Sequence, residues 1–477
     1  MRRYGQGLFR AASLAIVLLT GAPKANAAGF ASARFGGEHG TPVDTNPTAL
    51  YYNPGAIGFS DGINLFLDGQ IALRHATWSH TAPTPDPNLS QSPDMQVGNS
   101  GQASLFNVFG GPALGATMKI DNVAFGAGLF VPFGGRAHFD KNNTLGAPQS
   151  SAYPGAVDGV QRWTITDGAL TFIYATVGAA YHLGPVSLGV SGNAVLSQVQ
   201  LSQAVNPFGL PDATKEGRES LDVSGFDLSF GVGAMVEVLP KRVWVGASYQ
   251  SQPGLGTQTL RGTFDLRQTV GSTDAIHQQA TFTQALPDIY RGGAKWRANE
   301  QLELRAFGDF TRWSVMKAQC VALRTPAAGG GLDDHPCQVF ANGSDASNGN
   351  VLANHVRNWK DTYGVRLGGS YWVKPEIEVF AGVGYETGAT PDATVDPATM
   401  DGDNLGAALG GRFYLFDAFY LAASYTHLQF LARDNTGKSQ LEAINGVGIL
   451  APTQQQDAGG KYTQWIGIVD INVQKQF

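Results

Sequence analysis

The chain has 477 residues, and its charged fraction of 15% lies well below the roughly 25% of a soluble domain. Glycine supplies 62 residues, the mean hydropathy is −0.11 and the net charge is −6 at pH 7. Few charges without long apolar blocks exclude a disordered chain, a basic nucleic-acid binder and a helical membrane protein. The composition favours a large all-β protein with one apolar face spread along many strands.

The first 27 residues have the features of a secretory signal peptide. Three arginines lie in the first ten residues, residues 11–20 are apolar, and Ala25-Asn26-Ala27 fits the small-residue cleavage pattern. The alternative, a buried core helix, fits these flanks less well. Removing residues 1–27 removes four basic and no acidic residues, which leaves 28 basic against 38 acidic residues and a net charge of −10. An acidic mature chain argues against nucleic acid or anionic lipid as a partner.

From residue 62 onward, segments that alternate between apolar and polar residues are separated by turn-rich segments. Residues 226–238, 302–311 and 377–386 each place apolar side chains on one face and small or charged ones on the other. Short connections alternate along the chain with long polar ones. Short turns on one rim and long loops on the other are typical of bacterial outer-membrane barrels. We therefore predict an all-β fold, a transmembrane antiparallel β-barrel of about 14 strands over residues 62–477.

The final segment, residues 462–477, also alternates and ends on Phe477, in phase with its apolar face. This ending resembles the terminal strand that bacterial outer-membrane barrels offer to their insertion machinery. A single terminal phenylalanine can arise by chance, but the whole alternating strand is a stronger signal. Aromatic residues near strand ends, among them Tyr181, Trp296 and Trp313, are expected in two girdles at the membrane interfaces.

Residues 28–61 do not alternate and are predicted to form a separate N-terminal segment. Two Asn-Pro steps, Asn46-Pro47 and Asn53-Pro54, indicate turns or helix starts. A compact segment before a barrel either hangs in the periplasm or fills the lumen, and a barrel of this size has a lumen wide enough to need filling. We predict that residues 28–61 form a hatch that plugs the barrel.

The chain has two cysteines, Cys320 and Cys337, in a part of the sequence rich in Gly, Asp and Asn. In an oxidising compartment this pair indicates a loop disulfide, and the alternative is two free thiols.

Four short motifs in this sequence resemble the motifs of one known family. They are Tyr51-Tyr52-Asn53-Pro54 in the hatch, Val131-Pro132-Phe133-Gly134 in the third strand, Leu286-Pro287-Asp288, and Trp359-Lys360-Asp361. In order and spacing, over nearly the whole mature chain, they resemble the FadL/TodX family of outer-membrane transporters of hydrophobic compounds. One departure is Asn53-Pro54-Gly55, where the family usually has Asn-Pro-Ala. The resemblance implies a bacterial outer-membrane monomer that takes up hydrophobic compounds, most of all long-chain fatty acids, by passive transport.

The resemblance also implies a route for the ligand. The hatch, with Asn53 and Pro54, closes the lumen, and Phe30 at the mature N-terminus contributes to the ligand pocket. The kink at Pro132, Phe133 and Gly134 opens a gap in the wall, through which the ligand leaves sideways into the membrane. Proline lacks an N–H and interrupts the ladder there. The alternative is a local bulge without a role in transport.

A fatty acid carries a carboxylate, which is costly to bury without a cation. The resemblance places Lys360 near the ligand's head group, and Arg366 is the reserve candidate because an even spacing puts both on one strand face. The alternative is that Lys360 pairs with Asp361, or with a loop acid, at an exposed rim.

Other functions find less support. Residues 110–117 have glycines at P-loop spacing but no lysine, and no acid or cysteine completes a metal site around His75 and His80. We predict no catalysis, no cofactor and no metal, with an outer-membrane lipase as a remote alternative. The expected partners are a hydrophobic small molecule, outer-membrane lipids and, through Phe477, the insertion machinery. The functional alternatives are an aromatic-hydrocarbon transporter, a general porin and a structural or adhesive barrel.

Overall fold

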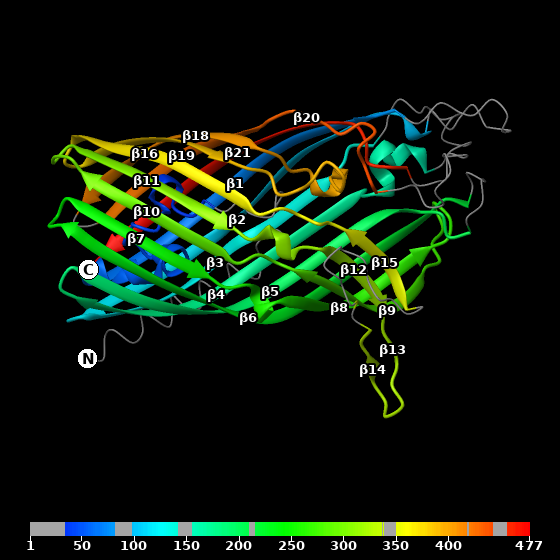
Figure 1. Cartoon of the computed structure of the whole chain (residues 1–477), viewed down its shortest axis with the longest axis horizontal. Coiled ribbons are helices and arrows are strands. Elements are labelled where there is room, and N and C mark those ends of the chain that lie inside the picture. The colour runs from blue at the N-terminus through cyan, green and yellow to red at the C-terminus, as the bar shows by residue number, and fades with distance from the viewer. Residues whose placement is uncertain are drawn as a thin grey trace.

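The computed structural model describes residues 34–81, 98–141, 155–208, 215–335, 337, 350–416, 419–441 and 456–477. Fourteen antiparallel strands close into one barrel, which confirms the prediction of an all-β barrel of about 14 strands (Figure 1). The first six wall strands are β1 (Ile63–His80), β2 (Gly101–Ile120), β3 (Val123–His138), β4 (Asp167–Leu183), β5 (Val186–Val205) and β6 (Gly217–Leu239). The last four are β17 (Ile377–Glu386), β18 (Asn404–Phe416), β19 (Phe419–Phe430), which β20 (Arg433–Asp434) extends, and β21 (Lys461–Gln476).

The four wall strands between these two groups are each interrupted once. Their segments nearer the short turns are β7 (Val243–Gln250), β10 (Ile289–Arg297), β11 (Leu302–Thr311) and β16 (Thr362–Lys374). Their segments nearer the long loops are β8 (Thr257–Arg267), β9 (Ile276–Ala285), β12 (Ala318–Leu323) and β15 (Val351–Val356). We call the second set, which pairs in the order β8–β9–β12–β15, the upper sheet. Within the described residues, the other edge of β15 pairs with no strand.

The last strand closes the barrel against the first. β1 and β21 pair from Asn64↔Gln476 to Ser79↔Lys461. The backbone N–H of Phe477 donates to the carbonyl of Ile63 (2.8 Å), and Ile63 donates back (3.2 Å). The C-terminus therefore lies at the end that carries the short turns, opposite the long connections (Figure 1).

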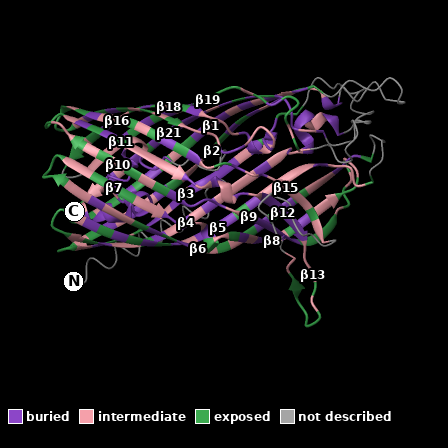
Figure 2. Cartoon of the chain, in the orientation of Figure 1, coloured by how far each residue is buried: buried purple, intermediate pink, exposed green. Residues whose placement is uncertain are grey.

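Burial alternates along the wall strands, as a two-residue period requires, so that exposed and buried bands succeed each other around the cylinder (Figure 2). Outward apolar residues such as Leu188 and Val190 are 61% and 58% exposed, whereas Ser187 and Ser191, on either side of this pair, face the packed interior. Tyr181 and Trp296 are exposed on the outer face, as a girdle requires. The expectation is wrong for Trp313: a short 3-10 helix, η7 (Trp313–Val315), turns it inward and buries it.

The described part of the hatch, residues 34–61, packs inside the barrel near the short turns. It contains η1 (Gly37–His39), α2 (Ala49–Tyr52) and η2 (Pro54–Phe59). Leu50 and Ile57 are fully buried and share one apolar cluster with Phe130 of β3 and Tyr174 of β4. Within the described residues, no helix combines the length and apolar character needed to cross a membrane. The predicted signal peptide lies outside the described residues.

Four short 3-10 helices lie among the connections. They are η3 (Ala156–Asp158) and η4 (Val160–Trp163) before β4, η6 (Pro253–Leu255) between β7 and β8, and η8 (Pro397–Thr399) before β18. A hairpin of β13 (Thr325–Pro326) and β14 (Leu332–Asp333) projects sideways from the upper sheet (Figure 1).

Candidate ligand cavity and lateral window

The ladder between β2 and β3 ends halfway up the wall. The two strands pair from Ile120↔Val123 to Leu114↔Leu129 and no further. β2 remains paired with β1 up to Gly101, and β3 remains paired with β4 up to His138. Both strands therefore continue upward with one edge each unpaired. We call the interval between residues 108–113 of β2 and residues 130–137 of β3 the lateral window.

An extra residue in β3 turns it away from β2. Phe130 lies opposite Tyr174 of β4, and Phe133 lies opposite Phe172, so three steps on β3 match two on β4. Val131 and Pro132 occupy this bulge, which bends the strand. Proline has no N–H to pair with the missing neighbour.

The facing edge of β2 carries a proline as well. Pro112 lies two residues above the last pair of the β2–β3 ladder and also lacks an N–H. Pro112 is not among the residues predicted from the sequence, although a proline inside an alternating strand is itself a signal for an unpaired edge.

Above the window the two strands meet again through a side chain. The Asn107 amide donates to the carbonyl of His138 and accepts from its N–H, both at 3.0 Å. One further backbone bond joins Asp140 N–H to the Ser104 carbonyl (2.8 Å). The window is therefore bounded below by the ladder and above by these contacts.

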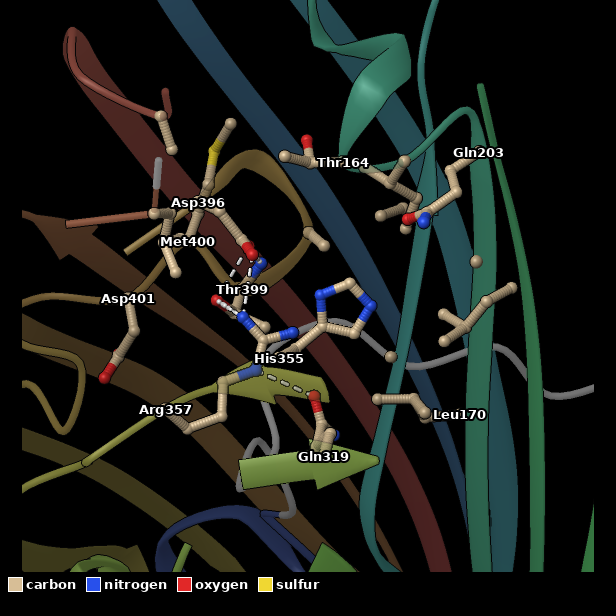
Figure 3. Close-up of a pocket in the computed structure, with 18 of the residues that line it drawn as sticks. Thr164, Leu170, Gln203, Gln319, His355, Arg357, Asp396, Thr399, Met400 and Asp401 are labelled. Carbon is tan, nitrogen blue, oxygen red and sulfur yellow. Dashed lines mark hydrogen bonds and ion pairs between the residues drawn. The ribbon is translucent and has the colours of Figure 1, made fainter. Parts of the chain in front are cut away.

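A cavity of about 550 Å³ lies inside the barrel behind the window. Its size falls in the range of small-molecule sites. Gly135, Arg136 and Ala137 of β3 line it, so the cavity reaches the unpaired edge. In Figure 3, Leu170 and Gln203 lie on one side, and residues of β12, of β15 and of the 387–403 loop on the other.

One side of the cavity is apolar, and residues of the sequence motifs contribute to it. Trp313 and Trp359 pack edge to face with ring centroids 5.0 Å apart, and both line the cavity. Phe133, from the bulged strand, packs against Trp313 (6.1 Å). Further apolar side chains come from Ile165, Leu170, Leu201, Phe282, Leu428 and Ile466.

The other side of the cavity is polar and closes the free edge of β15. Arg357, which follows β15, donates to Gln319 (2.9 Å) and to Asp396 (2.7 Å) (Figure 3). Burial opposes ionisation of Asp396, but the Arg357 guanidinium and the Thr399 hydroxyl hold its pKa below the ordinary value. The Thr394 hydroxyl also donates to the Arg357 carbonyl (2.5 Å). The cavity thus combines an apolar wall with fixed charges.

The motifs that carry the family resemblance lie at the strand interruptions. The Leu286 carbonyl accepts from the Gln252 amide (2.9 Å), and Asp288 pairs with Arg312 (2.6 Å). Asp361 accepts from the backbone N–H of Ser314 (2.8 Å). Side-chain bonds therefore join a few remaining backbone bonds, such as that from Arg312 N–H to the Asp288 carbonyl (3.0 Å), where the four strands break.

The hatch motif anchors the plug to the wall. The Asn53 amide donates to the carbonyls of Pro42 (2.7 Å) and Ala234 (2.9 Å), and its oxygen accepts from Gly55 N–H (3.1 Å). Pro54 opens η2, where its missing N–H is not needed. A Cβ at Gly55 would lie 2.6 Å from the Gly233 carbonyl oxygen, which explains why this chain departs from alanine there.

The remaining candidate residues lie apart from one another. Phe30 lies outside the described residues. Lys360 lies in the interruption between β15 and β16, is exposed, and does not line the cavity. Arg366 faces the lumen lower down, over the Phe307 ring (5.2 Å). The interruption before β16 removes the basis for the even-spacing argument, because residue 360 is outside the strand.

Cys320 of β12 and Cys337 form a disulfide beside the projecting hairpin.

These features define a class: a bacterial outer-membrane β-barrel with a plugged lumen, an internal ligand cavity and a window in its wall. Residues 21–446 match the family described as outer membrane protein transport protein (OMPP1/FadL/TodX), and the chain belongs to that family. The protein is therefore an outer-membrane transport protein of a family that carries hydrophobic compounds. A relative in Neisseria meningitidis serogroup B, named as an outer membrane protein (NMB0088), is 22% identical over 404 residues, 80% of each chain.

Solved structures share the fold. A Pseudomonas aeruginosa FadL homologue has a TM-score of 0.70 at 18% identity, over 96% of this chain and 99% of that one. The toluene transporters TbuX of Ralstonia pickettii and TodX of Pseudomonas putida have TM-scores of 0.59 and 0.61 at 17% and 15% identity. Each comparison covers 95% of this chain and 99% of the other.

Proposed function

We propose that this chain takes up long-chain fatty acids through the outer membrane and releases them sideways through the lateral window. The observation that carries the proposal is the continuity of the cavity with the unpaired edge of β3 at Gly135, Arg136 and Ala137. Transfer of a hydrocarbon chain into the membrane is favourable by about 0.8 kcal/mol per CH₂. Partitioning therefore drives release without an energy source.

The charged side of the cavity favours an amphiphile over a plain hydrocarbon. A monoaromatic hydrocarbon offers no partner to guanidinium and amide groups, and polar groups left unpaired lower affinity. It remains the second candidate cargo because two structures of the same fold are named as toluene transporters. Lys360 is proposed as a first contact for an anionic head group, since its exposed ammonium can meet a ligand outside the cavity.

The variants that test this proposal are designed to straighten β3. Deleting Pro132 removes the extra residue of the bulge, and the double variant Pro132→Ala, Gly134→Ala removes the kink with full chain length. Both are expected to lower uptake of radiolabelled oleate by cells that lack their own transporter. Pro185→Ala, in an exposed short turn, is the matched control. Heat-modifiability on gels verifies that each barrel has folded.

Unchanged uptake by folded variants would contradict sideways release. A large steady single-channel current through the wild-type protein would instead favour a porin.

A further inference from the structure

Arg74 of β1 differs from the other buried arginines of the described chain. Five of the six make an ion pair within 4.0 Å: Arg34 with Glu386, Arg162 with Glu216, Arg305 with Glu303, Arg357 with Asp396, and Arg412 with Glu378. Arg74 is 2% exposed, yet within the described residues it has no ion pair. The carboxyl of Asp401 acts on Arg74 electrostatically from beyond 4.0 Å. A buried cation without an ion pair is still costly, so this position calls for an explanation.

The Arg74 guanidinium faces the cavity and is held by two neutral acceptors. Its Nε donates to the Gln464 amide oxygen (2.8 Å), and its Nη1 donates to the backbone carbonyl of Arg136 (3.1 Å). A guanidinium has five N–H donors, so donors remain for a further acceptor. Leu428 and Ile466 line the same cavity and supply apolar side chains beside Arg74, together with the carboxyl of Asp401.

The second of these bonds crosses the top of the window. Arg136 lies on the unpaired edge of β3, where its carbonyl has no strand partner from β2. Arg74 projects from β1, opposite Asn107 of β2, and so spans β2 to reach β3. The guanidinium thus satisfies an orphan carbonyl and joins the two sides of the window.

We infer that Arg74 binds the anionic head group of a long-chain amphiphile in the cavity, and that this binding releases its hold on the edge of β3. The inference rests on the proposed function and extends it to a specific residue and to a carboxylate-bearing ligand. A carboxylate can take two parallel N–H bonds from a guanidinium and carries the opposite charge, whereas the Arg136 carbonyl accepts one bond and is neutral. The head group therefore displaces the Arg136 carbonyl, and the edge beside the window loosens when the cavity is loaded.

Binding measurements on the purified full-length protein in a non-ionic detergent test the head-group site. The probes are hexadecanoic acid and its methyl ester. Arg74→Met is expected to weaken binding of the acid at least about tenfold and to change binding of the ester by less than about twofold. Arg74→Lys keeps the charge but not the fork geometry, so it should fall between wild type and Arg74→Met. Arg297→Met, at the short-turn end of the barrel, is the matched control and should change neither.

Hydrogen exchange of the peptide that covers residues 130–138 tests the release. The acid should speed its exchange in the wild type and the ester should not, while in Arg74→Met the exchange should be fast without ligand. Arg74→Lys provides the binding comparison if Arg74→Met does not fold. The inference is overturned if either substitution weakens binding of the acid and of the ester equally, or weakens binding of neither. That outcome leaves the proposed function standing. A folded wild type that binds neither probe would refute the proposed function itself.

Discussion

Substitution of Asn53 by alanine should loosen the hatch and make the barrel conduct ions. Asn53 makes three hydrogen bonds that tie the hatch to itself and to β6. Undocking breaks the bond to the Ala234 carbonyl, which contributes about 1 kcal/mol net, whereas the other two bonds lie within the hatch. Its loss raises the population of the undocked hatch by a factor of about 5.

Planar-bilayer recordings provide the assay. Wild-type protein is expected to show rare, brief openings, whereas Asn53→Ala should show frequent ones at the same salt concentration. Asn64→Ala is the matched control, because that amide makes one exposed hydrogen bond to Asp61 at the turn (2.8 Å). An Asn53→Ala protein that folds and conducts no more than wild type would refute the view that this side chain holds the plug.

Three further predictions concern the entrance, the disulfide and the pH response. Lys360→Ala should weaken binding of a fatty acid more than binding of its methyl ester, as measured by calorimetry. Equal effects on the two ligands would show that Lys360 does not bind the carboxylate. Replacing Cys320 and Cys337 by alanine should speed proteolysis of the projecting hairpin without unfolding the barrel, because a cross-link across a loop of this length contributes about 3 kcal/mol; unchanged cleavage kinetics would argue against that role. Burial, with the charges of Arg305 and Arg412, lowers the pKa of His39 from 6.5 to about 4, so the docked hatch should be fully stable above pH 6.5 and lose stability as the pH falls toward 4. Conductance should rise over that interval, and a His39→Gln protein with the same pH profile would contradict this assignment.

Much of the wall could be predicted from the sequence because a half-buried strand imposes a strict period of two. Residues 377–386, which alternate from Ile377 to Glu386, form β17 with those bounds. The rhythm of short and long connections also gave the strand number, since each short turn joins two neighbouring strands. Local pattern and tertiary structure agree here.

The strand interruptions and the cavity could not be predicted in this way. Trp313 was expected at a membrane interface because it follows an alternating segment, but η7 turns it into the lumen beside Trp359. Lys360 was placed on a strand face, although the chain leaves the sheet at that point. In both cases contacts with other strands decide the direction of a side chain. The alternation within one segment carries no information about those contacts.

Arg74 carried no local signal at all. An arginine in an alternating strand is compatible with a solvated lumen, and its lack of an ion pair emerges only when β1, β3 and β21 are brought together. The absence of an ion pair at Arg74 is thus a property of the closed barrel.

The four aligned interruptions give the barrel unequal stiffness along its axis. Below them, the wall is one continuous ladder, in which any change of shape must strain many hydrogen bonds at once. The upper sheet is joined to that cylinder through side-chain bonds and a few backbone bonds, such as that from Trp359 N–H to the Met316 carbonyl (3.2 Å). Among the described strands, its ladder continues along β6. Its far edge is fastened to the 387–403 loop by Arg357 and Asp396. The compliant part of the molecule is therefore the part that encloses the cavity, so the cavity can change shape while the circumference held by the membrane stays constant.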